Sequence, residues 1–224
     1  MKMSANNILL IGASEHAKVV MDAIEKEGKY KIHGLIDSYK PAGEDVFGYK
    51  ILGAEDALAN LFQSGEVMGG IITIGDNWTR HLVAEKIRSL QPDFKFINVI
   101  HPSASIARGV TIGAGTVLMA GVIVNSDSRI GESCILNTKS ALDHDCVMGD
   151  FSSLAPGATT GGKVSIGAFS AISLGASVIH GVKIGEHVVL GAGAVALKDI
   201  PDHSIAYGVP AKVIRKRQAG DKYL

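Results

Sequence analysis

The sequence has few cysteines, few aromatic residues and no net charge. Cys134 and Cys146 are its only cysteines in 224 residues, which excludes a disulfide framework, and no C-x-x-C pair indicates a zinc site. Lys plus Arg and Asp plus Glu both number 22, so no overall field favours nucleic acid or an anionic membrane. The sequence also lacks an apolar run of membrane-spanning length and an N-terminal secretory signal. We therefore expect a cytoplasmic protein that binds neither nucleic acid nor membrane.

Glycine, in contrast, is abundant, with 27 residues, and it accompanies a repeat of six residues that starts at Ile100. Stepping by six from Ile100 reaches an apolar residue at every position up to Ala196, with Thr160 as the exception. A small or β-branched residue follows four places after members of this series, and both cysteines fall on that second track. Their position predicts small buried thiols.

A period of six fits neither an α-helix nor an isolated hairpin, but it is typical of a parallel β-helix. Each hexad then forms one side of a triangular prism, with large apolar side chains inside and small residues where the chain turns a corner. Three hexads make one coil, so residues 18 apart lie one above another at about 4.8 Å. We predict a β-helix over residues 100–200, followed by a C-terminal tail over 201–224.

The first part of the chain alternates buried strands with helices. We predict strands at 6–13, 31–37, 67–76 and 94–100 and helices at 15–28, 53–62 and 77–90. This alternation indicates a small parallel α/β sheet, placed at residues 1–99. Ligands of such sheets bind at the carboxyl ends of strands, where the chain reads "GASEH" (12–16), "DS" (37–38) and "GDN" (75–77). The G-x-G-x-x-G spacing is missing, so no dinucleotide is expected; a mononucleotide or nucleotide-sugar site and glycines that only form turns both stay open.

The segment "ALDHDCVMGD" (141–150) places three ionisable residues inside the repeat. In hexad register Leu142 points inward, so Asp143, His144 and Asp145 lie at outward or corner positions, where a solvated surface turn is one interpretation. A histidine beside a carboxylate is also the minimal general base, because one ring nitrogen takes a proton while the acid holds the other.

The register of the coils supports the acid–base interpretation. His180 lies two coils after His144, with Gly162 between them, so two imidazoles flank a glycine floor. On the neighbouring track Asp127, Asp145 and Lys163 would stack, and the lysine would favour the ionised carboxylate. A metal site is the alternative, but the third histidine of a β-helical zinc cluster is not at its expected place, where the chain has Gly185.

Several motifs together resemble the bacterial sugar acetyltransferases of the left-handed β-helix class. They are "GASEHAKVV" (12–20), "ITIGDNWTR" (72–80), "INVIHPSA" (97–104), "LNTKSALDHDCVMGDF" (136–151) and "YGVPAKVI" (207–214), in this order over nearly the whole chain. This group includes UDP-4-amino-sugar and GDP-perosamine N-acetyltransferases and sialic-acid O-acetyltransferases. The resemblance implies a Rossmann-like N-terminal domain before a left-handed β-helix, acetyl-CoA as donor, no metal, and a homotrimer with active sites between subunits.

The resemblance also implies roles for individual residues. His144 would be the catalytic base, Asp145 its partner, and Asn137 a residue on the acceptor side. The nucleotide-linked amino sugar would be held by the residues that match the N-terminal motifs: Ser14, Glu15, His16, Asp37, Gly75 and Asn77. Coenzyme A would be contacted at Ser153, Leu174, Ala192, Lys212 and Arg215.

Two departures from the family pattern affect these assignments. Members often carry a histidine nine residues after the catalytic one, where this chain has Ser153. The first turn often reads G-x-G-G-H, and here Ser14 and Glu15 replace part of it, which brings a negative charge near a phosphate unless Glu15 points away. For Lys212 and Arg215, contact with coenzyme A phosphates and an ordinary basic tail stay equal alternatives.

We predict an acetyl-CoA-dependent N-acetyltransferase that acts on a nucleotide-linked amino-deoxy sugar, with a 4-amino group favoured. The alternatives are a sugar O-acetyltransferase of the sialic-acid type, a metal-dependent lyase or hydratase on the same scaffold, and a trimer that binds a sugar nucleotide without catalysis.

Overall fold

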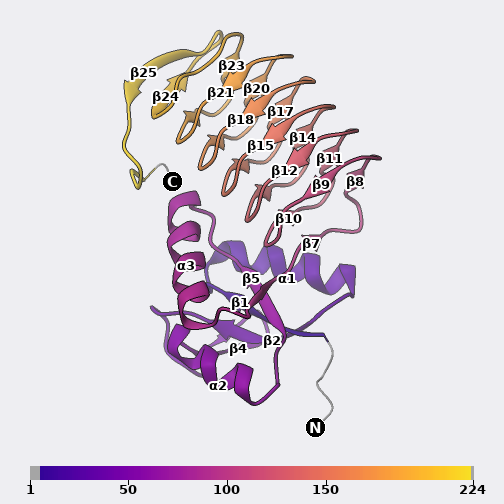
Figure 1. Ribbon diagram of the computed structural model, residues 1–224, viewed down its shortest axis with the longest axis vertical. Helices are drawn as coiled ribbons and strands as arrows, with labels where there is room; N and C mark the ends of the chain where they lie inside the picture. The colour runs from indigo at the N-terminus through magenta and orange to yellow at the C-terminus, as the bar shows by residue number, and fades with distance from the viewer. Residues whose placement is uncertain (1–5, 223–224) are drawn as a thin grey trace. The chain divides into compact units, whose positions relative to one another are not determined.

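The computed structural model describes residues 6–222, and their contacts divide the chain into two compact units (Figure 1). The first unit comprises the residues up to Gly75 together with Thr79–Pro102. The second comprises Asp76–Trp78 together with the residues from Ser103 onward. The predicted boundaries at 99 and 200 stay predictions.

The first unit is the α/β domain that the sequence predicts. Its elements are β1 (Asn7–Ile11), α1 (Glu15–Glu27), β2 (Lys31–Ile36), β3 (Asp45–Val46), β4 (Tyr49–Gly53), η1 (Glu55–Ala57), α2 (Leu58–Gln63), β5 (Gly69–Ile72), α3 (Asn77–Leu90), β6 (Lys95–Phe96) and β7 (Val99–Ile100). The sheet has the order β3-β4-β2-β1-β5-β6, and the pairs from β4 to β6 are parallel. β1 lies inside this order with β2 and β5 on its two sides, and its Ile8, Leu9 and Leu10 are fully buried.

The sequence did not predict the hairpin formed by β3 and β4. Its turn uses left-handed backbone at both Phe47 and Gly48, and the Asp45 carboxylate accepts a hydrogen bond from the Gly48 N–H at 2.9 Å. Two successive left-handed residues define the tight turn that suits the twist of antiparallel strands. Phenylalanine is an unusual residue for such a position, so the local signal was weak.

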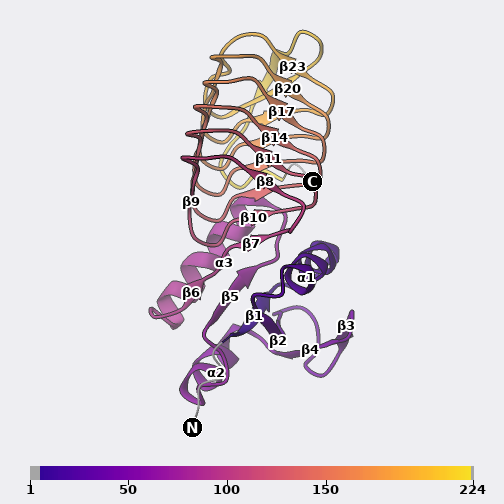
Figure 2. The same cartoon turned by 90° about the vertical axis from the view of Figure 1, so that its right-hand side faces the viewer.

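The second unit is a left-handed β-helix with three flat faces. The first face has the order β10 (Val117–Leu118), β13 (Ile135–Leu136), β16 (Ser153–Leu154), β19 (Ala171–Ile172), β22 (Val189–Leu190), β24 (Ser204–Tyr207) and β25 (Lys212–Lys216). The second face, whose strands rise one above another in Figure 2, contains β8 (Ser105–Ile106), β11 (Ile123–Val124), β14 (Ala141–Leu142), β17 (Thr159–Thr160), β20 (Ser177–Val178) and β23 (Val195–Ala196). The third face contains β9 (Thr111–Ile112), β12 (Arg129–Ile130), β15 (Val147–Met148), β18 (Ser165–Ile166) and β21 (Lys183–Ile184).

The loops between faces form three edges of the prism. We call the edge from the first to the second face the first edge (for example 137–140), the next the second edge (143–146), and the edge back to the first face the third edge (149–152). Strand partners are 18 residues apart, as in Leu118 with Leu136 and Leu136 with Leu154, which confirms the predicted coil length.

The interior confirms both tracks of the hexad repeat. Leu136, Leu142 and Leu154 are fully buried, and Cys134 and Cys146 are buried free thiols. Each thiol donates to a carbonyl of the next coil, Cys146 to Gly161 at 3.3 Å and Cys134 to Gly149 at 3.2 Å. Polar residues on the small track are therefore tolerated inside because their hydrogen bonds are satisfied.

Candidate functional site

His144 and Asp145 form a hydrogen-bonded pair at the second edge, directly after β14. The His144 Nδ1 lies 2.8 Å from the Asp145 carboxylate, and the two side chains are 47% and 51% exposed. Asp145 has left-handed backbone, with φ of 56°, at the corner where the chain turns. Because the carboxylate engages Nδ1, the neutral imidazole presents Nε2 as its proton-accepting nitrogen.

Asp143 orders the start of this loop. Its carboxylate accepts hydrogen bonds from the Asn125 side-chain amide at 2.7 Å and from the His144 N–H at 2.8 Å. The hydrogen bond from Asn125, followed by that from His144, lowers the pKa of Asp143. Asp143 is thus an acceptor that fixes the backbone of His144, and Asp145 is the carboxylate that contacts the imidazole.

Thr160 is the one polar residue in the apolar series, and its hydrogen bond accounts for this exception. At the equivalent positions of neighbouring coils, the backbone N–H donates to a backbone carbonyl of the next coil. Examples are the Asn125 N–H to the Leu142 C=O at 2.9 Å and the Gly161 N–H to the Val178 C=O at 2.8 Å. At the catalytic candidate, the Asp143 N–H donates instead to the Thr160 hydroxyl at 3.0 Å. The side chain of β17 therefore holds the loop that carries His144.

Gly162 and His180 continue the row above His144, as the 18-residue coil predicts. The Lys163 N–H donates to the His144 carbonyl at 2.8 Å, which joins the two coils at this edge. A Cβ atom on Gly162 would overlap the His144 Nε2, so the imidazole lies over a position that only glycine leaves open. The His144 and His180 ring centroids are 6.2 Å apart, and His180 is exposed.

The residues predicted to contact coenzyme A lie mostly at the first edge. Leu174 follows β19 and is 58% exposed, and Ala192, one coil later, is exposed after β22. The Gly193 N–H donates to the Leu174 carbonyl at 2.8 Å, which places the two positions in one row. Asn137 lies at this same edge, where its amide donates to the Leu154 carbonyl at 3.2 Å.

Within one protomer, one face of the prism therefore separates these residues from His144. The second face lies between the first edge, with Asn137, Leu174 and Ala192, and the second edge, with His144. Ser153 lies elsewhere again, nearly buried on the first face.

Lys212 and Arg215 lie on β25, which pairs antiparallel with β24. Both are exposed, and an Arg215 guanidinium nitrogen lies 3.9 Å from the Asp221 carboxylate. The segment is thus an ordered strand of the first face, and the basic side chains remain accessible to an anion.

The residues of "GASEH" occupy the start of α1. Ser14 is the N-cap residue of α1, and its hydroxyl makes a long hydrogen bond to the Thr73 carbonyl at 3.4 Å. Glu15 is exposed, whereas His16 is partly buried. Burial, followed by the nearby charge of Arg80, lowers the pKa of His16 to about 4, so His16 is neutral at pH 7.

Gly75 and Asn77 have defined partners. The Gly75 carbonyl accepts a hydrogen bond from the Arg80 guanidinium at 3.0 Å. The Asn77 side chain donates to the Ser170 carbonyl at 3.1 Å and to the Phe169 carbonyl at 3.4 Å, within the second unit. Asn77 is almost completely buried, and its amide serves the β-helix.

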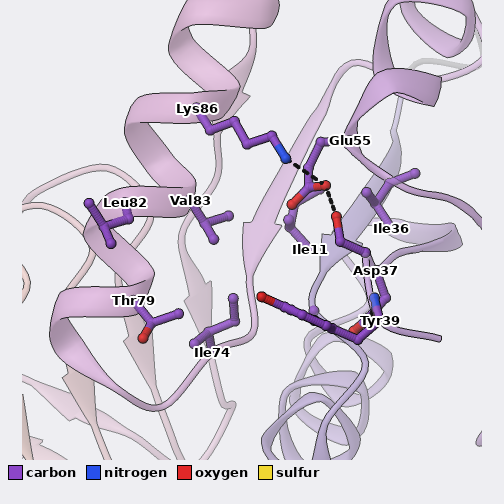
Figure 3. A pocket seen from close by; sticks show the side chains of 12 residues that line it. Ile11, Ile36, Asp37, Tyr39, Glu55, Ile74, Thr79, Leu82, Val83 and Lys86 are labelled. Carbon is purple, nitrogen blue, oxygen red and sulfur yellow. Dashed lines mark hydrogen bonds and ion pairs between the residues drawn. The ribbon is translucent and has the colours of Figure 1, made fainter. Parts of the chain in front are cut away.

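Asp37 lines a cavity of about 290 Å³ in the first unit (Figure 3). Its carboxylate accepts hydrogen bonds from the backbone N–H groups of Ala13 at 2.7 Å, Tyr39 at 2.8 Å and Lys40 at 3.1 Å. These bonds fix the ends of β1 and β2. The walls are mainly aliphatic, and Glu55 and Lys86 form an ion pair among the lining residues.

Sequence reasoning missed several of these residues. Glu55 follows the carboxyl end of β4, so a correct prediction of that strand would have placed an acidic residue at the ligand edge. It also missed an aromatic ladder on left-handed residues of the third edge, where the rings of Phe151, Phe169, His187 and His203 stack with centroids 4.6–5.7 Å apart. Trp78 packs edge-on against Phe169 at 5.4 Å.

Two further features concern residues 6–222 as a whole. No group of three or more His, Cys, Asp or Glu side chains in this range could hold a metal ion. Among the described helices, none combines the length and the hydrophobicity that a membrane-spanning segment requires.

Comparison with known proteins covers both units. Residues 7–87 match the family model of the PglD N-terminal domain. The chain is similar to GDP-perosamine N-acetyltransferase from Caulobacter crescentus, solved with CoA and GDP-perosamine, with 35% identity and a TM-score of 0.89 over 96% of this chain and 100% of that one. It is also similar to the acetyltransferase domain of PglB from Neisseria gonorrhoeae, with 32% identity and a TM-score of 0.85 over 93% of this chain and 100% of that domain.

A longer relative matches part of the chain. Serine acetyltransferase from Buchnera aphidicola is 32% identical over 135 residues, which span 56% of this chain and 43% of that protein. The chain thus spans less than half the length of this curated relative.

Proposed function

We propose that this chain, which belongs to the bacterial sugar acetyltransferases of the hexapeptide-repeat class, transfers the acetyl group of acetyl-CoA to the amino group of a nucleotide-linked amino-deoxy sugar, with a 4-amino sugar favoured. The observation that carries the proposal is the hydrogen bond between the His144 imidazole and the Asp145 carboxylate on an exposed edge of the β-helix. The relative from Caulobacter crescentus, bound to CoA and GDP-perosamine, supports the donor and the class of acceptor. A further structure of the PglB domain holds acetyl coenzyme A.

The geometry is suited to general-base catalysis. The acceptor nitrogen attacks the thioester carbonyl carbon, the carbon–sulfur bond breaks, and coenzyme A leaves as a thiolate. His144 Nε2 takes the proton that the amine loses, and the Asp145 carboxylate on Nδ1 stabilises the imidazolium that forms. Such assistance is worth on the order of 10²–10⁴ in rate.

We further propose a homotrimer in which each active site is shared between two subunits. Within one protomer, His144 lies at the second edge, whereas the proposed coenzyme A positions Leu174 and Ala192 lie at the first edge. Cyclic association of three prisms can bring the second edge of one subunit to the first edge of its neighbour. Asn137, on the first edge, would then face the acceptor of the neighbouring His144.

Thiol release from acetyl-CoA tests the proposal. A panel of nucleotide-linked amino sugars and of free sugars such as sialic acids is incubated with the enzyme, and the product is identified by mass and by its amide or ester linkage. We expect thiol release with an amino-sugar nucleotide and an amide product. An ester product would establish O-acetylation instead, and no turnover of any acceptor would favour a binding protein without catalysis.

A further inference from the structure

We propose that the turn of the preceding coil, residues 125–128, holds the proposed base in place, with Asn125 and Ser128 as positioning residues for the reaction. We call residues 143–146, which carry His144, the catalytic turn. This inference rests on the proposed function, since it assumes that His144 is the base. It gives a role in catalysis to two side chains that act through His144 rather than on the substrate.

Ser128 joins the two ends of the catalytic turn. Its hydroxyl donates to the Asp143 carbonyl at 2.6 Å and accepts a hydrogen bond from the Cys146 N–H at 3.0 Å. Both Ser128 and Cys146 are fully buried, so water does not replace this acceptor if the hydroxyl is removed. One buried side chain therefore fixes the residues on either side of His144 and Asp145.

Asn125 and Ser126 hold the exposed part of the same turn. The Asn125 amide donates to the Asp143 carboxylate at 2.7 Å, and the same carboxylate oxygen accepts the His144 N–H at 2.8 Å. The Asp145 N–H donates to the Ser126 carbonyl at 3.0 Å, which supports the left-handed backbone of Asp145. The preceding coil thus fixes the backbone of both members of the acid–base pair.

The following coil differs at the equivalent positions. Gly161 and Val164 stand there in place of Asn125 and Ser128, and their side chains cannot form such hydrogen bonds. Between them lies Gly162, where a Cβ atom would overlap the imidazole. Asn125 and Ser128 therefore support the catalytic turn from one side, and glycine leaves room for the ring on the other.

The third edge offers a matched control for Ser128. The Ser170 hydroxyl donates to the Gly185 carbonyl at 2.6 Å and accepts from the Val188 N–H at 2.9 Å. Ser170 is likewise fully buried. The two serines make the same pair of hydrogen bonds between coils, but only Ser128 makes them to the catalytic turn. A loss of activity that is specific to Ser128 then cannot come from a general loss of stability.

Replacements of Ser128 test the inference with side chains that this chain already uses at the equivalent positions, Cys146 and Val164. We expect Ser128→Val to lower kcat for thiol release by about tenfold or more, because small displacements of a catalytic group cost this much, with little change in either KM. Ser128→Cys should keep most of kcat, since the Cys146 thiol donates to the Gly161 carbonyl at 3.3 Å in the same way.

Ser170→Val should lower the melting temperature about as much as Ser128→Val and yet keep the wild-type kcat. Equal losses of kcat in these two variants, or equal kcat values for Ser128→Val and Ser128→Cys, would overturn the assignment.

The pH dependence of Asn125→Asp tests the second residue, whose exposed side chain can be replaced without opening the core. The hydrogen bond from Asn125 is the main cause of the lowered pKa of Asp143, which is therefore ionised at neutral pH. A carboxylate at position 125 would repel it until one of the two is protonated. The kcat of the variant relative to wild type at the same pH should be lowest near pH 8 and rise toward pH 5. A ratio that does not change with pH would contradict the role of Asn125.

Nitrogen NMR of protein with labelled histidine separates this inference from the proposed function. At pH 8 a fixed tautomer of His144 gives two well-separated ring-nitrogen signals, and tautomer exchange gives averaged ones. We expect separated signals in wild type and averaged signals in Ser128→Val, with His144→Gln to identify them. If this pattern holds but wild type releases no thiol with any acceptor, the proposed function fails and the positioning role stands. If wild type acetylates while Ser128→Val keeps its kcat and its separated signals, the positioning role fails alone.

Discussion

The most distinctive residue of the β-helix is His144, whose imidazole has a direct carboxylate partner in Asp145. His187 and His203 are members of the aromatic ladder, and His180 is exposed two coils above Asp143 and His144. His144 forms an ion pair with the neighbouring Asp145. The pair supplies what a general base needs, namely a fixed tautomer and a nitrogen directed away from the carboxylate.

Replacement of His144 by glutamine should therefore lower kcat by about 10²–10⁴ while the KM values for both substrates change little, because the base acts on the chemical step. Asp145→Asn should give a smaller loss, since the imidazole remains. Initial rates of thiol release measure both. His33→Gln in the first unit, where His33 pairs with Glu66, is the control that keeps wild-type rates. A His144→Gln enzyme that turns over at the wild-type rate would refute the assignment.

His16 makes the stability of the protein depend on pH. Its folded-state pKa of about 4 lies below the ordinary value of 6.5, so the unfolded chain binds the proton more readily between these values. Above pH 6.5 the protonation of His16 does not affect the free energy of unfolding, and this free energy decreases as the pH falls from 6.5 toward 4. The shift corresponds to an upper limit of about 3 kcal/mol in the free energy of unfolding.

Melting temperatures of wild type and His16→Gln between pH 7.5 and 4.5 test this. Wild type should lose more stability than the variant over this range, because glutamine does not titrate. Parallel pH profiles for the two proteins would show that His16 is protonated in the folded state as easily as in the unfolded chain.

Thr160 shows how one strand of the repeat is adapted to the site. Its hydroxyl replaces a backbone acceptor and holds the Asp143 N–H at 3.0 Å, one residue before the proposed base. Thr160 is therefore a positioning residue. Thr160→Val keeps the volume but removes the acceptor, which costs about 1–3 kcal/mol if the N–H is left without a partner.

We expect Thr160→Val to lower kcat by between about 10- and 100-fold, because small displacements of a catalytic group cost this much. The KM for acetyl-CoA should stay near the wild-type value. Thr160→Ser restores the hydroxyl and should recover most of kcat, which distinguishes positioning from a general loss of packing. Equal kcat values for the Val and Ser variants would contradict the role.

The elements also show what a sequence can and cannot predict here. The strict six-residue period predicted the prism, the buried cysteines and the vertical row of His144, Gly162 and His180, because each coil repeats the same geometry. The hairpin at Asp45–Gly53 escaped detection, since its turn has a phenylalanine in left-handed backbone. The cavity pair of Glu55 and Lys86 joins elements that are 31 residues apart, and only the folded sheet brings them together.

The site predictions divide in the same way. Local neighbours such as His144 and Asp145 could be recognised from their adjacency, and their hydrogen bond is present. The predicted role of Asn77 in substrate binding stays a prediction. Its amide also donates to carbonyls of the β-helix 92 and 93 residues later, and a sequence motif does not reveal such a long-range backbone partner.

If the proposal is correct, the first and second edges of the prism form an active site only with a partner subunit. His144 and Ala192 belong to edges on opposite sides of the second face, so a site that uses both needs the neighbouring chain. Light scattering should then give three times the chain mass of 23.4 kDa.

Mixed trimers test the sharing directly. His144→Ala removes the base, and Ala192→Trp places an indole on the first edge, where coenzyme A is proposed to approach the main chain; each variant alone should be inactive. After random reassembly of equal amounts, about a quarter of the sites combine an intact second edge from one subunit with an intact first edge from the next. Thiol release should therefore return to roughly that fraction of wild type. A mixture of His144→Ala and His144→Gln, which offers no intact base, should stay inactive, and equal inactivity of the first mixture would place the whole site within one protomer.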